Sequence, residues 1–192
     1  MRLTRLLLRS DPPEAVERYV TSIIWDRRRG DSLRTLATVL MTEGHPDLAL
    51  PILARAREEQ PGDHRCDIVA ADCHLRLGDV DAALAELDRV PPTSGQAPQA
   101  AGKRFLAHLA EGDLARAEEA IASVRGIADG LYETAWNLAL AAQRPEREPP
   151  LLPTGLEREK TLEVLLDIAS GLLTAGRLEP FNRLIPLLYA VA

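Results

Sequence analysis

Apolar residues recur at spacings of three and four along most of this chain, between segments rich in glycine, proline and charged residues. The first two such stripes are Leu33, Leu36, Ala37 and Leu40, followed by Ala49, Leu53 and Ala56. Residues with this spacing share one face of a helix, so each stripe predicts an amphipathic helix. No segment alternates apolar and polar residues between turn signals, which would predict a strand. The pattern therefore predicts an all-α protein.

The stripes repeat with a fixed period. Gly44, Gly78 and Gly112 follow one another at a constant interval, and an alanine follows each of them at the same distance. These alanines are Ala49, Ala83 and Ala117. A glycine accepts the left-handed backbone conformation that ends a helix, and a small residue lets two helices approach closely. We therefore expect three helix–turn–helix repeats, at residues 30–63, 64–97 and 98–128.

This pattern resembles the tetratricopeptide repeat, whose period of about 34 residues equals the interval between the glycines and whose small and apolar residues follow the same order. The resemblance implies a right-handed α-solenoid of stacked antiparallel helix pairs, with a concave face that binds another protein. The repeats diverge from the family, because its tryptophan position holds Leu33, Asp67 and Ala101 here. Pro51 falls inside a predicted second helix, where it removes one hydrogen bond.

Both flanks of the repeats are expected to be helical. Residues 1–29 are predicted to form a capping region, with a helix from Asp11 to about Arg29 that ends at the cations Arg27-Arg28-Arg29. Residues 129–192 are predicted to add a helix, a proline-rich linker or strap at 144–154, and a degenerate fourth repeat at 156–192 that turns at Gly176. Such a proline density is incompatible with a helix.

The C-terminal helix is more apolar than the end of a solenoid normally is, since terminal repeats carry a polar outer face. Its Leu187, Leu188 and Tyr189 define a second candidate interface. Three interpretations stay open: the helix packs on its neighbour, it forms a homodimer, or the sequence is part of a longer protein.

Charge and composition narrow the partner classes. The net charge of −6 argues against nucleic acid, whose binding depends on neutralising phosphates. No apolar run approaches the roughly 20 residues of a membrane span. The apolar run Leu6–Leu8 is too short for a secretion signal, so we expect a cytoplasmic protein. Cys66 and Cys73 are seven residues apart on one predicted helix, about 10 Å along its axis, too far for a disulfide.

No catalytic or cofactor motif is present in the sequence. We find no HExxH motif, no phosphate-binding loop and no nucleophile elbow. His74 and His108 are separated by the same interval as the glycines and fill the same position of successive repeats, which indicates a structural role. We therefore expect a protein that is not an enzyme and that needs neither a metal nor a cofactor.

The resemblance also implies which residues face the concave groove. Family offsets place Met41, Leu75 and Leu109 on its floor, and the following residues nearby: Arg34, Thr38, Ile68, Asp72, Arg76 and Leu106. Such a groove suits an apolar or amphipathic partner segment. The alternative is that the N-terminal helix or the proline-rich segment covers these residues.

Family members that bind acidic C-termini use a clamp of lysines, an arginine and asparagines. The corresponding residues are Arg34, Thr38, Val69, Gln99 and Lys103. Only two of them are cations, so this clamp is not expected here. Two functions remain open: a non-catalytic adaptor, scaffold or chaperone-like module, or an accessory region of a larger enzyme or regulator such as a glycosyl- or sulfotransferase.

Overall fold

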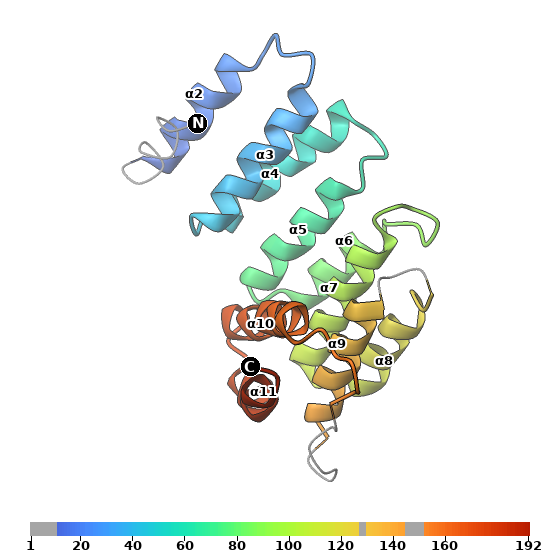
Figure 1. Cartoon of the computed structure of the whole chain (residues 1–192). Helices are drawn as coiled ribbons and strands as arrows, with labels where there is room; N and C mark the ends of the chain where they lie inside the picture. Colours follow the sequence, from blue (N-terminus) through green and yellow to red (C-terminus); the bar gives the residue numbers. More distant parts are fainter. Residues whose placement is uncertain (1–10, 127–129, 145–151) are drawn as a thin grey trace. The chain divides into compact units, whose positions relative to one another are not determined.

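The computed structural model describes residues 11–126, 130–144 and 152–192, and within them the chain consists of helices joined by turns (Figure 1). The helices are α2 (Pro12–Ser22), α3 (Arg29–Thr42), α4 (Pro46–Glu59), α5 (Arg65–Arg76), α6 (Val80–Leu87), α7 (Ala97–Glu111), α8 (Leu114–Ala122), α9 (Gly130–Ala142), α10 (Arg158–Thr174) and α11 (Leu178–Val191). No strand occurs in this part of the chain. The predicted all-α class is confirmed.

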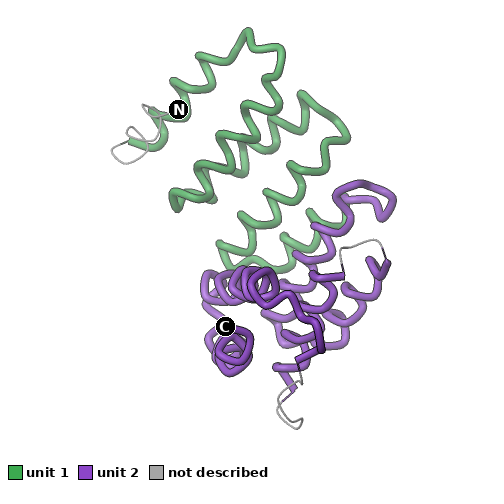
Figure 2. The backbone as a smooth tube through the Cα atoms, viewed as in Figure 1, with its two compact units in different colours: residues 1–89 green, residues 90–192 purple. Residues whose placement is uncertain are grey.

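The chain divides into two compact units, Met1–Arg89 and Val90–Ala192 (Figure 2). Each unit has its own hydrophobic core. The core of the first unit gathers residues of α2 to α5, such as Leu33, Leu40 and Leu53. The core of the second unit gathers residues of α7 to α11, such as Phe105 and Leu172.

Helix pairs recur along the chain, as the period predicted. Contacts join α3 to α4, α5 to α6, α7 to α8 and α10 to α11. The alanines Ala49, Ala83 and Ala117, one in the second helix of each of the first three pairs, are fully buried. A larger side chain at these positions would force the paired helices apart.

Four turns between paired helices share one geometry. Each contains a glycine with positive φ: Gly44 (92°), Gly78 (79°), Gly112 (76°) and Gly176 (70°). The residue after each glycine donates its backbone N–H to the carbonyl five residues earlier, at 2.8–2.9 Å. This bond satisfies a carbonyl that the end of the helix would leave unpaired. The left-handed glycines are therefore confirmed, and the turn at Gly176 matches the other three.

Helix α2 is shorter than the sequence predicted, and this expectation is corrected. The helix ends at Ser22 instead of near Arg29. The hydroxyls of Thr21 and Ser22 donate to the carbonyls of Glu17 and Tyr19. Such local bonds favour the end of a helix. Ile24, which lies within the predicted range of this helix, belongs to the following turn instead and is half exposed.

The cluster Arg27-Arg28-Arg29 therefore lies at the start of α3 rather than at the end of a helix. The carboxylate of Asp26 holds the turn by accepting hydrogen bonds from the Arg28 N–H (2.9 Å) and the Ser32 hydroxyl (2.7 Å). Gly30 lies in the first turn of α3. A Cβ at Gly30 would lie 2.7 Å from the Gln60 side chain, so close packing accounts for the glycine.

Helix α11 packs on the second unit through its apolar side. Leu184, Leu187 and Val191 are buried in the core of that unit, and Leu188 is partly buried against it. Tyr189 projects outward, 80% exposed. Of the three interpretations of this helix, the structure shows packing within the chain. Most of the predicted proline-rich segment, residues 145–151, lies outside the described residues.

Both cysteines are buried thiols on α5, and they form no disulfide. Burial raises the pKa of Cys66 to about 11 and that of Cys73 to about 12. Because the thiolate is the reactive form, both thiols are almost fully protonated at pH 8. We expect a disulfide reagent such as DTNB to modify neither cysteine of the folded protein at pH 8, and both in denaturant. Rapid modification of the folded chain would show that α5 opens readily.

Candidate functional site

In the first unit, the apolar side chains predicted to form the groove floor lie in the interior. Met41 of α3 is 8% exposed and belongs to the core of this unit. Ile68 and Leu75 of α5 are also buried. Asp72 is half-buried and Arg76 is exposed.

The polar groove residues of α3 bond within the chain. Arg34 lies 3.1 Å from Asp31 and 3.7 Å from Asp63, measured between nitrogen and carboxylate oxygen. The Thr38 hydroxyl donates to the Arg34 carbonyl at 3.0 Å. A partner at this face would therefore compete with bonds that Arg34 and Thr38 already make.

In the second unit, the two predicted groove residues of α7 have different environments. Leu109 is fully buried in the core of this unit. Leu106 is half-buried and lines a pocket. Leu106, which was expected next to the groove floor rather than on it, thus lines the pocket described below. Leu109, which was expected on the floor, lies in the core and lines a smaller cavity with Gly112 and Arg183.

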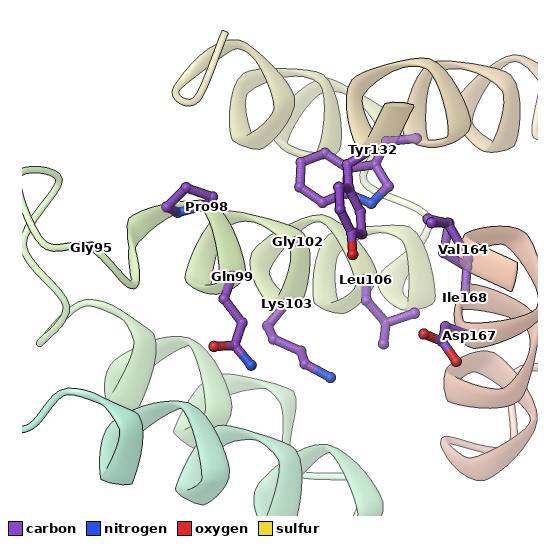
Figure 3. Close-up of a pocket in the computed structure, with 11 residues that line it drawn as sticks. Gly95, Pro98, Gln99, Gly102, Lys103, Leu106, Tyr132, Val164, Asp167 and Ile168 are labelled. Atoms are coloured by element: carbon purple, nitrogen blue, oxygen red, sulfur yellow. The ribbon is translucent and has the colours of Figure 1, made fainter. Parts of the chain in front are cut away.

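This pocket, of about 520 Å³, lies between α7, α9 and α10 within the second unit (Figure 3). Its lining is Gly95, Pro98, Gln99, Gly102, Lys103, Leu106, Tyr132, Trp136, Val164, Asp167 and Ile168. The volume falls within the range of about 300–1,000 Å³ that is usual for ligand sites, and the mixture of an apolar lining with a few polar groups is typical of them.

An aromatic cluster forms one wall of the pocket. The ring of Trp136 stacks on Phe105 with 6.0 Å between centroids and an interplanar angle of 23°. Tyr132 lies tilted against the same indole at 6.1 Å. Gly102 makes room for this arrangement, since a Cβ there would lie 2.8 Å from the Trp136 ring. The indole thus reaches the backbone of α7.

The opposite wall depends on a second glycine in the middle of a helix. A Cβ on Gly171 of α10 would lie 2.5 Å from a methyl carbon of Leu106. Helix α10 therefore approaches α7 closely and covers part of the face that the sequence assigned to the groove. Val164 and Ile168, which precede Gly171 on α10, complete the apolar lining.

Three polar side chains surround the apolar floor. Gln99 and Lys103 project from α7, and Asp167 projects from α10 toward the same space (Figure 3). Gln99 and Asp167 are exposed, and Lys103 is half-buried and has an interaction within the chain. Among the described residues, no hydrogen bond or ion pair engages the Asp167 carboxylate.

Sequence reasoning missed most of this pocket. It named Leu106 as a groove residue and Gln99 and Lys103 as positions of a clamp, but it did not assign Trp136, Val164, Asp167 or Ile168 to any site. The available signal was the pair of glycines inside helices, Gly102 and Gly171. A glycine in a helix costs about 1 kcal/mol relative to alanine, so its presence indicates a packing or functional reason.

A separate charge cluster stabilises the first unit. Arg57 of α4 places Nη2 2.7 Å from Asp67 of α5 and 2.6 Å from Glu86 of α6. The Nδ1 atom of His64 lies 2.9 Å from the same aspartate. Asp67 is 4% exposed and occupies one of the tryptophan positions of the repeat pattern. The cluster links α4, α5 and α6.

The described residues contain no group of three or more His, Cys, Asp or Glu side chains that could hold a metal ion. His108, the half-buried histidine of α7, has its pKa lowered by burial. In the part of the chain that the structure describes, no helix is both long and apolar enough to cross a membrane.

A family profile described as tetratricopeptide repeat matches residues 40–108, which extend from the end of α3 to most of α7. No curated protein and no solved structure matches the chain. The match includes the part of α7 that carries Gln99, Lys103 and Leu106, and it ends before α9 and α10.

Proposed function

We propose that this chain, of which residues 40–108 match the tetratricopeptide repeat profile, is a non-catalytic protein-interaction module that holds an apolar or amphipathic partner segment in the pocket between α7, α9 and α10. Tetratricopeptide repeats indicate interaction with other proteins. Our proposal adds to this general role where the partner segment binds and that the segment is apolar or amphipathic.

The observation that carries the proposal is the pocket itself. It combines an apolar floor of Leu106, Trp136 and Ile168 with polar groups at the rim, where a peptide backbone would need hydrogen bonds. Burying one leucine-sized side chain of a partner there stabilises a complex by about 1.5–3 kcal/mol before ordering costs. Several such contacts would give the micromolar affinity, about 8 kcal/mol, that is common for segment recognition.

The proposal predicts that filling the pocket abolishes partner binding without unfolding the protein. Val164 lines the pocket, so Val164→Phe is expected to place the added ring in the cavity and to weaken binding at least tenfold. The matched control is Leu166→Phe, which enlarges an exposed side chain of the same helix outside the pocket. Circular dichroism and the thermal midpoint establish that both variants are folded.

Photo-crosslinking in the source cells supplies the measurement. A benzophenone amino acid at position 99 stands at the rim of the pocket, and one at Glu119 stands on the exposed face of α8. We expect a crosslinked partner from position 99, lost in the Val164→Phe background and retained with Leu166→Phe. The proposed site would be contradicted by partners that crosslink equally from both positions, or whose crosslinking from position 99 is unchanged by Val164→Phe.

A further inference from the structure

We infer that the segment held in this pocket is basic, with a lysine or arginine beside its apolar anchor residues, and that Asp167 binds this cation. The inference rests on the proposed function and adds the chemistry of the partner. It follows from the charges of the pocket-lining residues and from the interactions that these residues make, or do not make, within the folded chain.

Two charged side chains, Lys103 and Asp167, line the pocket, and they differ in whether they already interact with other residues of the chain. Lys103 already has an interaction within the chain. The Asp167 carboxylate is exposed and has no hydrogen bond or ion pair with any described residue. In Figure 3 it projects from α10 toward the space that Leu106 lines. Of the two charged groups in the pocket, the Asp167 carboxylate is therefore the one that no described residue engages, and it is the group that we assign to the ligand.

The geometry favours a long cationic side chain over a compact ion. Leu106 and Ile168 provide apolar surface next to Asp167. Lysine and arginine cover such surface with their methylene stems while the charged head stays at the rim. A simple hydrated cation would gain nothing from the apolar floor. One charged group beside an apolar wall thus matches an amphipathic side chain.

Neighbouring groups of the pocket complete the recognition of a peptide. Tyr132 is 47% exposed, and its hydroxyl can accept a hydrogen bond from a guanidinium or ammonium group. Gln99 offers both an amide donor and an acceptor, which matches the N–H and C=O groups of an extended segment. The chain as a whole carries a net charge of −6, which favours the approach of a basic segment and disfavours an acidic one.

The test is selection of a random peptide library, displayed on phage, against the full chain and its variants. We expect peptides selected by the unmodified protein to carry lysine or arginine next to leucine, isoleucine, valine or phenylalanine. Against Asp167→Lys the selected peptides are expected to carry aspartate or glutamate at that position. Against Asp167→Asn the preference for a charge is expected to disappear.

Affinity measurements with one selected synthetic peptide give the magnitude. Asp167→Asn is expected to weaken binding about tenfold at low salt, about 50 mM, and by less at about 500 mM, because salt screens an exposed charge pair. The control is Glu163→Gln, which removes a neighbouring exposed carboxylate of α10 that does not line the pocket. It is expected to leave the affinity unchanged, so a general effect of net charge would be seen as equal losses in both variants.

The outcomes separate the two proposals. Selected peptides without basic residues, whose binding Val164→Phe still blocks, would overturn the basic partner and leave the pocket as the binding site. Binding that is insensitive to both Val164→Phe and Asp167→Asn would overturn both proposals. Failure of the library to yield any binder would also count against both, since the pocket would then not recognise peptide segments.

Discussion

Replacing Trp136 by alanine is expected to lower the free energy of unfolding of the second unit by about 3–5 kcal/mol, the usual cost of truncating a large buried aromatic residue. Trp136 is 6% exposed. It stacks on Phe105 and contacts Tyr132, and it fills the space that Gly102 leaves open on α7. Truncation would remove these contacts together and join their space to the pocket.

The chain contains a matched control, because its other tryptophan is exposed. Trp25 lies in the turn after α2 and is 92% exposed, so Trp25→Ala is expected to change the free energy of unfolding by no more than about 0.5 kcal/mol. Urea denaturation followed by far-ultraviolet circular dichroism measures both variants. Equal, small effects of the two substitutions would show that Trp136 is not part of the packed core.

The second large effect is expected at the charge cluster of the first unit. Arg57→Ala is expected to lower the free energy of unfolding by about 3–5 kcal/mol, because it leaves a buried carboxylate without its cation. That carboxylate is Asp67, which Arg57 contacts at 2.7 Å. In this variant Asp67 would keep only its contact with His64 among the ion pairs described above. Glu86 loses its 2.6 Å contact with Arg57 as well.

A double substitution distinguishes the loss of this pair from the loss of packing. Arg57→Met with Asp67→Leu removes both charges and keeps apolar volume, so the protein is expected to be more stable than with Arg57→Ala alone. Arg18→Ala is the control, since Arg18 forms an exposed pair with Glu14 and is expected to contribute no more than about 0.5 kcal/mol. If the double variant were as unstable as the sum of its single substitutions, coupling between the two charges would be refuted.

The repeat architecture could be predicted because it depends on interactions local in sequence. A positive φ is accessible mainly to glycine, and the hydrogen bond that ends each first helix joins residues five apart. Helices α9, α10 and α11 lie in the region 129–192 that was expected to be helical, and α10 and α11 are joined by the turn at Gly176. The tetratricopeptide profile matches residues 40–108, which include the turns at Gly44 and Gly78.

The end of α2 also depends on interactions local in sequence, but these are hydrogen bonds of polar side chains, which the spacing of apolar residues does not reveal. The apolar positions from Val16 to Ile24 continue at helical spacing beyond the point where the helix stops. The polar side chains of Ser22 and Asp26 bond the backbone or the next helix there. Apolar periodicity alone therefore overestimated the length of this helix.

The tertiary structure decided which residues of the predicted groove are accessible. Leu106 and Leu109 are neighbours on α7, one turn apart, and both were expected at the concave face. Contacts from α10, a helix far later in the chain, leave Leu106 at a pocket, and Leu109 lies within the core. Burial of an apolar side chain depends on which distant helix covers it, and the period of one repeat carries no information about that.

The sequence by itself determined that this protein is built of helix pairs with a repeat like that of the tetratricopeptide family, since turn glycines and apolar spacing act within a few residues. Only the tertiary structure brought Gln99, Trp136 and Asp167, from three helices, around one pocket. It also placed Arg57 between Asp67 and Glu86. Both arrangements depend on how closely separate helices approach, and that distance is fixed by the shapes of side chains that meet only in the folded chain.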